Sequence, residues 1–325
     1  MSLFTSLPKT DLHCHLDGSL RMETLCELAD MQGIRLPALP GSAAYDSLEQ
    51  YLQAFAITCS VMQTADAIAR VAFELIEDAA LDNVKHIEVR FCPTFLTEQG
   101  LSHDEVIEAA LHGMGSASGK YGISTGLILC AMRNSPPTQS LAIAKLAITY
   151  RRRGVVALDL AGPEAGYPAK AHAESFREAL RHGLHTTVHA GEGDGAESIR
   201  QALVDCGAQR IGHGVRVVES SELLDEVIKR QIPLEVCLSS NVQTGVVASM
   251  DNHPLRRLYD LGAKVTINTD NRLISHTTMS GELLLAHEHL GFSQAELTKL
   301  ISNGADSAFL SASERLELHG ALDVS

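Results

Sequence analysis

The amino-acid sequence predicts a (β/α)8 barrel of the TIM type, on the basis of two observations. Eight short, β-rich apolar runs alternate with longer amphipathic stretches, which is the order expected of parallel α/β architecture. Polar residues gather at the C-terminal ends of many of these runs, on the face where barrel enzymes build their sites. A doubly wound sheet also fits the alternation, but polar residues at so many strand ends favour the barrel.

The eight apolar runs are spread along the whole chain. We expect strands at residues 10–15, 84–92, 124–132, 155–161, 186–189, 210–213, 233–239 and 264–270. The connection after the first run holds roughly seventy residues, far more than the usual few for such loops. Its helical patterns at 21–33, 46–60 and 64–81 predict a helical insertion after the first strand, placed over the site.

The middle pattern of this insertion has one apolar face. Its apolar residues recur at i, i+3, i+4 and i+7, and they are Leu48, Tyr51, Leu52 and Phe55. This face either packs on the barrel or lines an apolar substrate pocket, and the pattern alone fits both.

Later helices carry clear start signals. Ser102 with Glu105, and Ser293 with Glu296, form capping boxes that predict a helix over 103–120 and another after 293. The helices that follow Asn271 are extra C-terminal elements that complete the outer layer of the barrel. Because the chain shows no repeat, low-complexity segment or linker, we interpret residues 1–325 as one domain.

Composition excludes several classes of protein. The chain has 325 residues, of which 45% are hydrophobic and 20% charged, and its formal charge of −14 opposes attraction to nucleic acid or anionic membranes. Seven cysteines without a Cys-x-x-Cys pair fit a reducing compartment, and no apolar run approaches the ~20 residues of a membrane span. We therefore expect a cytoplasmic protein with no nucleic-acid or membrane partner. Nothing in the sequence indicates an oligomeric state.

Four residues at strand ends form a candidate metal site. A strand projects residues i and i+2 to the same face, so His13 and His15 present two imidazoles while Cys14 points away. His189 and Asp270 end the fifth and eighth runs. Zinc accepts imidazole and carboxylate ligands, and a catalytic site leaves one position open for water. The sequence thus predicts one Zn²⁺ per chain, held by His13, His15, His189 and Asp270.

Two further polar residues follow the strand ends. Glu192 lies three residues beyond His189, behind Gly191, in the position of a general acid whose pKa burial would have to raise. His213, flanked by two glycines, either orients the attacking water or holds its proton; the alternative is a core histidine bonded to backbone. The remaining histidines are predicted to be surface or packing residues: His86, His103, His112, His172, His182, His185, His253, His276, His287, His289 and His319.

Five segments, taken together and in this order, resemble the adenosine deaminase family of the amidohydrolase superfamily. They are residues 10–18, 189–192, 212–214, 238–241 and 268–271. The resemblance spans nearly the whole chain. It implies a zinc-bearing (β/α)8 barrel that converts adenosine or deoxyadenosine, with water, to inosine or deoxyinosine and ammonia, a reaction of purine metabolism.

The resemblance also implies individual roles. It assigns the same four zinc ligands, makes Glu192 the group that protonates purine N1, and lets His213 and Asp270 orient the attacking oxygen. Asp17 would bond the ribose 5′-hydroxyl, and the backbone of Gly162 would contact purine N3. The substrate-contacting residues implied in this way are Asp17, Gly162, Asn271, His15, Tyr51 and Phe55.

Asn271 departs from the family pattern, in which two aspartates commonly end the last motif. The residue there must donate a hydrogen bond to purine N7, which only accepts. An asparagine amide donates at any pH, so we expect Asn271 to keep this contact.

Alternative functions differ from this one in single features. Relatives that deaminate adenine or aminodeoxyfutalosine commonly carry Glu where this chain has Asp17, so the shorter acid favours a nucleoside. A catalytically silent relative would be expected to lose a site residue, and all are present. A zinc hydrolase of amides or esters would not need the acid Glu192. Nucleic-acid deaminases of the other zinc class need Pro-Cys-x-x-Cys, which is absent.

Overall fold

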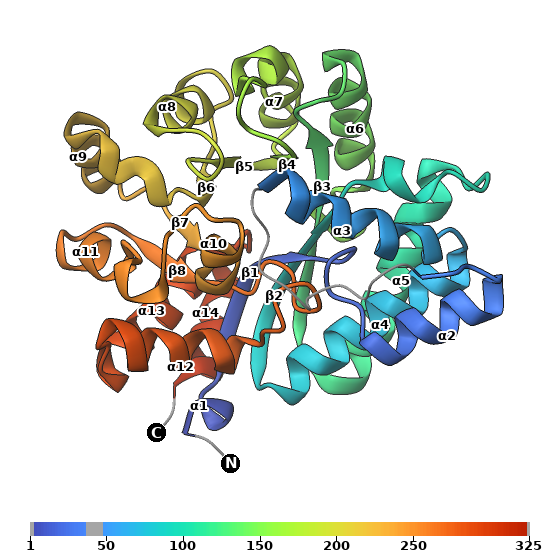
Figure 1. Ribbon diagram of the computed structural model, residues 1–325, viewed down its shortest axis with the longest axis horizontal. Coiled ribbons are helices and arrows are strands. Elements are labelled where there is room, and N and C mark those ends of the chain that lie inside the picture. Colours follow the sequence, from blue (N-terminus) through green and yellow to red (C-terminus); the bar gives the residue numbers. More distant parts are fainter. Residues whose placement is uncertain (1–2, 37–47, 324–325) are drawn as a thin grey trace.

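The computed structural model describes residues 3–36 and 48–323, with side chains for 4–36 and 55–323 (Figure 1). Eight parallel strands pair in sequence order, and helices surround them. The strands are β1 (Lys9–His15), β2 (Val84–Phe91), β3 (Ser124–Met132), β4 (Val155–Ala161), β5 (His185–Ala190), β6 (Arg210–His213), β7 (Leu234–Val236) and β8 (Val265–Ile267). The backbone N–H of His15 donates to the carbonyl of Asp270 at 2.6 Å, and that of Asp270 to the carbonyl of His13 at 2.7 Å. These bonds join β1 to the segment that follows β8, so the predicted TIM barrel is confirmed.

Two predicted strands were too long. We expected residues 233–239 and 264–270, whereas β7 ends at Val236 and β8 ends at Ile267. After β7 the chain turns at once into the short helix α10 (Leu238–Gln243). After β8 it reaches Asp270, whose φ of 59° is left-handed and incompatible with a strand. Apolar residues continue past β7 to Leu238, whereas the polar residues Asn268 and Thr269 follow β8.

The described residues of the insertion after β1 form three helices, as predicted. They are α2 (Met22–Gln32), α3 (Leu48–Val61) and α4 (Ala65–Leu81). In Figure 1, α3 crosses the barrel near β3 and β4. Phe55 on α3 lines the central cavity, which favours the pocket-lining interpretation of the apolar face. The side chains of Leu48, Tyr51 and Leu52 lie outside the described part of the structure.

The remaining helices form the outer layer of the barrel. They are α1 (Leu3–Ser6), α5 (His103–Tyr121), α6 (Pro137–Tyr150), α7 (Ala173–Arg181), α8 (Ala196–Val204), α9 (Ser221–Arg230), α11 (Leu255–Asp260), α12 (Met279–Leu290), α13 (Gln294–Ser307) and α14 (Ala312–Leu322), with 3-10 turns η1 (Pro93–Leu96), η2 (Ala169–His172), η3 (Val215–Glu219) and η4 (Met250–Asn252). Both predicted capping boxes, at Ser102 and Ser293, are present. Within the described ranges, no helix is long and apolar enough to cross a membrane.

The two faces of the strands bury different kinds of side chain. On β2, Ile87 and Val89 join the apolar core between strands and helices, while Glu88 and Arg90 alternate with them. Arg90 reaches Glu235 of β7 on the far side of the barrel at 2.8 Å, so these charged side chains meet in its interior. All of them are fully buried. Ion pairs between buried side chains therefore stabilise the barrel interior below the site. They also place charged groups near the ends of the strands.

Candidate active site

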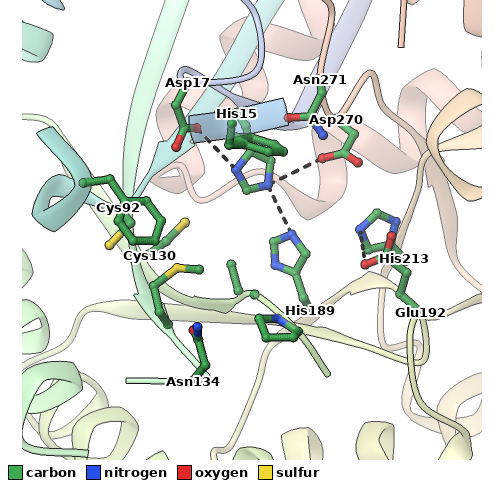
Figure 2. Close-up of a pocket in the computed structure, with 16 residues that line it drawn as sticks. His15, Asp17, Cys92, Cys130, Asn134, His189, Glu192, His213, Asp270 and Asn271 are labelled. Atoms are coloured by element: carbon green, nitrogen blue, oxygen red, sulfur yellow. Dashed lines mark hydrogen bonds and ion pairs between the residues drawn. The ribbon is translucent and has the colours of Figure 1, made fainter. Parts of the chain in front are cut away.

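The ends of the strands surround a cavity of about 230 Å³ (Figure 2). Most of the side chains singled out in the sequence converge there from distant segments. The lining residues are His15, Asp17, Phe55, Cys92, Phe95, Cys130, Met132, Asn134, Ala161, Gly162, Pro163, His189, Glu192, His213, Asp270 and Asn271. Sequence reasoning did not single out Cys92, Phe95, Cys130, Met132, Asn134, Ala161 or Pro163, because apolar and small side chains at strand ends carry no distinctive pattern.

The four predicted metal ligands meet at the floor of this cavity. Donor atoms of His13, His15, His189 and Asp270 all lie within 4.8 Å of one another. The Nε2 atoms of His15 and His189 are 3.2 Å apart, and Oδ1 of Asp270 is 3.5 Å from Nε2 of His15 (Figure 2). Nε2 of His13 is 3.4 Å from the same Asp270 oxygen. Residues from three segments distant in sequence thus present four donors to one point.

Hydrogen bonds on the far side of two rings orient them for a cation. Nδ1 of His13 lies 2.8 Å from a carboxylate oxygen of Glu235, and Nδ1 of His189 lies 3.0 Å from Oδ2 of Asp159. A carboxylate only accepts, so each Nδ1 carries the proton and each Nε2 presents a lone pair to the centre. Nε2 of His13 is buried and hydrogen-bonds to no described residue. This donor set fits a divalent metal ion.

The carboxylates behind the histidines share one cation. Arg90 donates to Asp159 at 3.0 Å and to Glu235 at 2.8 Å. Burial alone would raise the pKa values of both carboxyl groups. The hydrogen bond from His189 and the charge of Arg90 outweigh burial at Asp159, and the charges of Arg90 and Arg210 do so at Glu235, so both pKa values lie well below the ordinary range. Both groups are therefore ionised acceptors at neutral pH.

Glu192 occupies a loop that another carboxylate holds in place. Glu164 accepts hydrogen bonds from the backbone N–H groups of Gly191 at 2.6 Å, Glu192 at 2.9 Å and Asp194 at 3.0 Å. Burial raises the pKa of Glu192 well above its usual value, and the negative charges of Asp270 and Glu164 raise it further. A carboxyl group in this setting keeps its proton near neutral pH and can donate it.

His213 and Asp270 share an unusual backbone conformation. Each has a φ of 59°, in the left-handed region that residues other than glycine rarely adopt. Such conformations cost of order 1–3 kcal/mol and cluster at functional sites. Nε2 of His213 lies 3.5 Å from Oε2 of Glu192 (Figure 2). This left-handed backbone, at the end of β6 and just after β8, turns both side chains toward the cavity.

The other end of the cavity carries Asp17. Its side chain is buried, its Oδ1 accepts no hydrogen bond from a described residue, and burial raises its pKa to about 7. The ring of Phe55 lies edge-on to His15, with centroids 6.1 Å apart. Asn271 is next to Asp270 at the rim, and the backbone of Gly162 has a φ of 96°. The side chain of Tyr51 is not among those described.

Sequence reasoning missed three carboxylates that support the site: Asp159, Glu164 and Glu235. Two of them left a readable signal. Asp159 stands between Leu158 and Leu160, and Glu235 between Leu234 and Val236, and a charged residue inside a buried apolar strand requires a partner. Glu164 lies in a loop, and only its spatial neighbours identify it.

Comparisons with known proteins agree with this geometry. A family model described as adenosine deaminase matches residues 8–324. A protein of Clostridium acetobutylicum named adenosine deaminase is 40% identical over 98% of each chain, and one of Mycobacteroides abscessus is 43% identical over 97% of this chain and 93% of its own. Both relatives match over nearly their full length.

Solved structures of similar fold act on related purines. An adenine deaminase from Arthrobacter aurescens has a TM-score of 0.91 at 25% identity, covering 98% of each chain. The Arabidopsis N6-mAMP deaminase has a TM-score of 0.91 at 29% identity, covering 100% of each chain, and related Arabidopsis structures hold IMP or GMP. The match of the family model to nearly the whole sequence, together with relatives above 40% identity, means that this chain belongs to the adenosine deaminase family.

Proposed function

We propose that this chain is a zinc-dependent hydrolase that removes the C6 amino group of adenosine and deoxyadenosine, giving inosine or deoxyinosine and ammonia. One observation carries the proposal: the buried, raised-pKa carboxyl of Glu192 faces the same cavity as the four-donor cluster. The proposal treats the chain as one domain. It also places the protein in the cytoplasm, because all seven cysteines are unpaired thiols.

The residues divide the chemistry among them. Zinc held by His13, His15, His189 and Asp270 would supply a water whose pKa is lowered toward ~7. Glu192 donates its proton to purine N1, which makes C6 electrophilic. His213 and Asp270 orient the oxygen that attacks C6. A C–O bond forms at C6 and the C6–N bond breaks. Of the two protons of the water, one ends on the amino group, which leaves as ammonia, and the other restores the acid form of Glu192.

Other residues position the nucleoside. The buried Oδ1 of Asp17 is available to accept a hydrogen bond from the ribose 5′-hydroxyl. The backbone N–H of Gly162 donates to purine N3, and the amide of Asn271 donates to N7. His15 lies beside the ring, and Phe55 on α3 supplies an apolar contact on the side of the insertion.

The charge of the cavity favours a nucleoside over a nucleotide. Among its described lining residues none is lysine or arginine, and Asp17 lies at the end that would receive the ribose 5′ position. A 5′-phosphate carries close to two negative charges at neutral pH and would meet the Asp17 carboxyl with no lysine or arginine among these lining residues to neutralise it. This distinguishes the site from one built for a nucleoside monophosphate, although the fold is shared with a deaminase of that class.

The test is the loss of purine absorbance with zinc-loaded protein. Adenosine, deoxyadenosine, adenine, aminodeoxyfutalosine and AMP are compared at equal concentration. We expect rapid turnover of the two nucleosides only. Turnover of adenine or aminodeoxyfutalosine alone would overturn the substrate assignment that rests on Asp17, and turnover of AMP would overturn the charge argument. No turnover of any substrate would favour a catalytically silent relative.

A further inference from the structure

Asn241 lies between two buried histidines, one of which, His213, lines the active-site cavity. Its Nδ2 is 3.0 Å from Nδ1 of His213, and its Oδ1 is 3.2 Å from Nε2 of His253. All three side chains are at least 96% shielded from solvent, Asn241 completely. Asn241 belongs to α10, and His253 follows η4. The segment carrying Asn241 is one of the five that resemble the family, yet the proposed reaction gives this residue no role.

The direction of this hydrogen-bond chain is set by a backbone amide. The N–H of Leu255, at the start of α11, is 3.1 Å from Nδ1 of His253. A backbone N–H can only donate, so Nδ1 of His253 accepts. Burial lowers the pKa of His253 to about 3, so the ring is neutral and holds a single proton. That proton is therefore on Nε2.

Each later bond follows from the one before. Nε2–H of His253 donates, so the oxygen of Asn241 must face it. The amide nitrogen of Asn241 then faces His213 and donates to its Nδ1. The opposite amide orientation would place two N–H donors against each other at His253. Since Nδ1 of His213 accepts, the proton of the neutral His213 ring is on Nε2, the atom that lies 3.5 Å from Oε2 of Glu192.

We propose that Asn241 and His253 are positioning residues that hold His213 as its Nε2–H tautomer, so that His213 presents a hydrogen-bond donor to the active site. This builds on the proposed function and decides between the two roles open to His213 in the sequence. As a donor, His213 orients and stabilises the oxygen that adds to C6. It does not accept the proton of the attacking water, because the nitrogen that faces the site already carries a hydrogen.

The chain offers a substitution that should reverse the tautomer. Asn241→Asp keeps the size of the side chain but replaces the donor with a second acceptor. Nε2–H of His253 can still donate to it, whereas Nδ1 of His213 must now carry a proton. We expect His213 to shift to the Nδ1–H or doubly protonated form, with zinc content unchanged and kcat/KM for adenosine reduced about 10- to 100-fold, as for other partners of site residues.

The direct readout is ¹⁵N NMR of the histidine rings in zinc-loaded protein, which distinguishes protonated from unprotonated ring nitrogens without any turnover. A His213→Gln variant assigns the His213 signals. His172 serves as an internal control, because its Nε2 faces the carbonyl of Arg133 at 3.0 Å and should stay protonated in every variant. Asn303→Asp is the matched control for a buried amide. Nδ2 of Asn303 donates to the carbonyl of Val265 at 3.0 Å, and Asn303 takes no part in the hydrogen bonds that join His213, Asn241 and His253.

Two outcomes decide the proposal. Protonated Nε2 and unprotonated Nδ1 on His213 in the wild type, reversed in Asn241→Asp but not in Asn303→Asp, would support it. Protonated Nδ1 on His213 in the wild type would overturn it, even if adenosine is deaminated rapidly. If Asn241→Asp does not fold, His253→Leu replaces it: without the donor the amide can rotate, so a mixture of His213 tautomers supports the proposal and an unchanged single tautomer contradicts it.

Discussion

Replacing Asp159 by asparagine tests whether the carboxylates behind the histidines tune the metal site. Asp159 accepts from Nδ1 of His189 at 3.0 Å and from Arg90 at 3.0 Å, and its low pKa keeps it ionised at neutral pH. The asparagine side chain has almost the same shape but no charge. Its amide nitrogen is itself a donor and would face the N–H of His189 or of Arg90. Groups that hydrogen-bond to a metal-binding histidine contribute about 10- to 100-fold to metal affinity, which corresponds to about 1.4–2.7 kcal/mol.

The assay is a competition titration of zinc against a chromophoric chelator, with urea unfolding measured in parallel. Asp82→Asn is the matched control. Asp82 is also a buried carboxylate, bonded to Ser280 and 3.9 Å from Nζ of Lys9, but it contacts none of the metal-binding residues. We expect both variants to lose stability and only Asp159→Asn to lose zinc affinity. Equal zinc affinity in Asp159→Asn and the wild type would refute the claim that the carboxylate behind His189 strengthens metal binding.

Three further predictions concern single residues. Glu192→Gln should lower kcat for adenosine about 10²- to 10⁴-fold while zinc content stays the same, because an amide cannot give N1 a proton; a fully active variant would remove Glu192 from its role. Asn271→Ala should chiefly raise KM, by roughly 2- to 13-fold for one lost hydrogen bond, and an unchanged kcat/KM would exclude the N7 contact. Glu282 is fully buried and accepts bonds from Ser239 and Thr277, and burial raises its pKa to about 7. A carboxyl whose pKa is higher in the folded state binds more protons there, so its contribution to stability falls as the pH rises from about 4.5 to 7. Glu282→Gln should therefore gain stability relative to the wild type between pH 5 and pH 8 in urea unfolding, and a difference independent of pH would contradict this.

The fold was largely predictable because local patterns and the global architecture agree. Apolar runs separated by helical patterns identify all eight strands, and capping boxes such as Ser102 with Glu105 mark where helices begin. The errors lie at the ends of β7 and β8. At β7 the turn into α10 ends the strand within an apolar run, and at β8 polar residues and the left-handed backbone of Asp270 follow the strand. Side-chain patterning carries no information about backbone dihedrals.

The candidate site was predictable where its residues follow strands. His13, His15, His189 and Asp270 could be grouped from sequence because the C-terminal ends of parallel strands meet on one face. Partners that act through another side chain could not be grouped in this way. His253 was interpreted as a surface or packing residue, and only its bond to Asn241 relates it to His213.

The most direct test of the proposed reaction is to follow the oxygen atom of water into the product. Zinc-loaded protein is incubated with adenosine in ¹⁸O-labelled water, and the products are measured by mass spectrometry together with released ammonia. The account predicts inosine that carries one ¹⁸O atom, with one ammonia for each inosine. Unchanged adenosine, or free adenine and ribose from cleavage of the glycosidic bond, would contradict it.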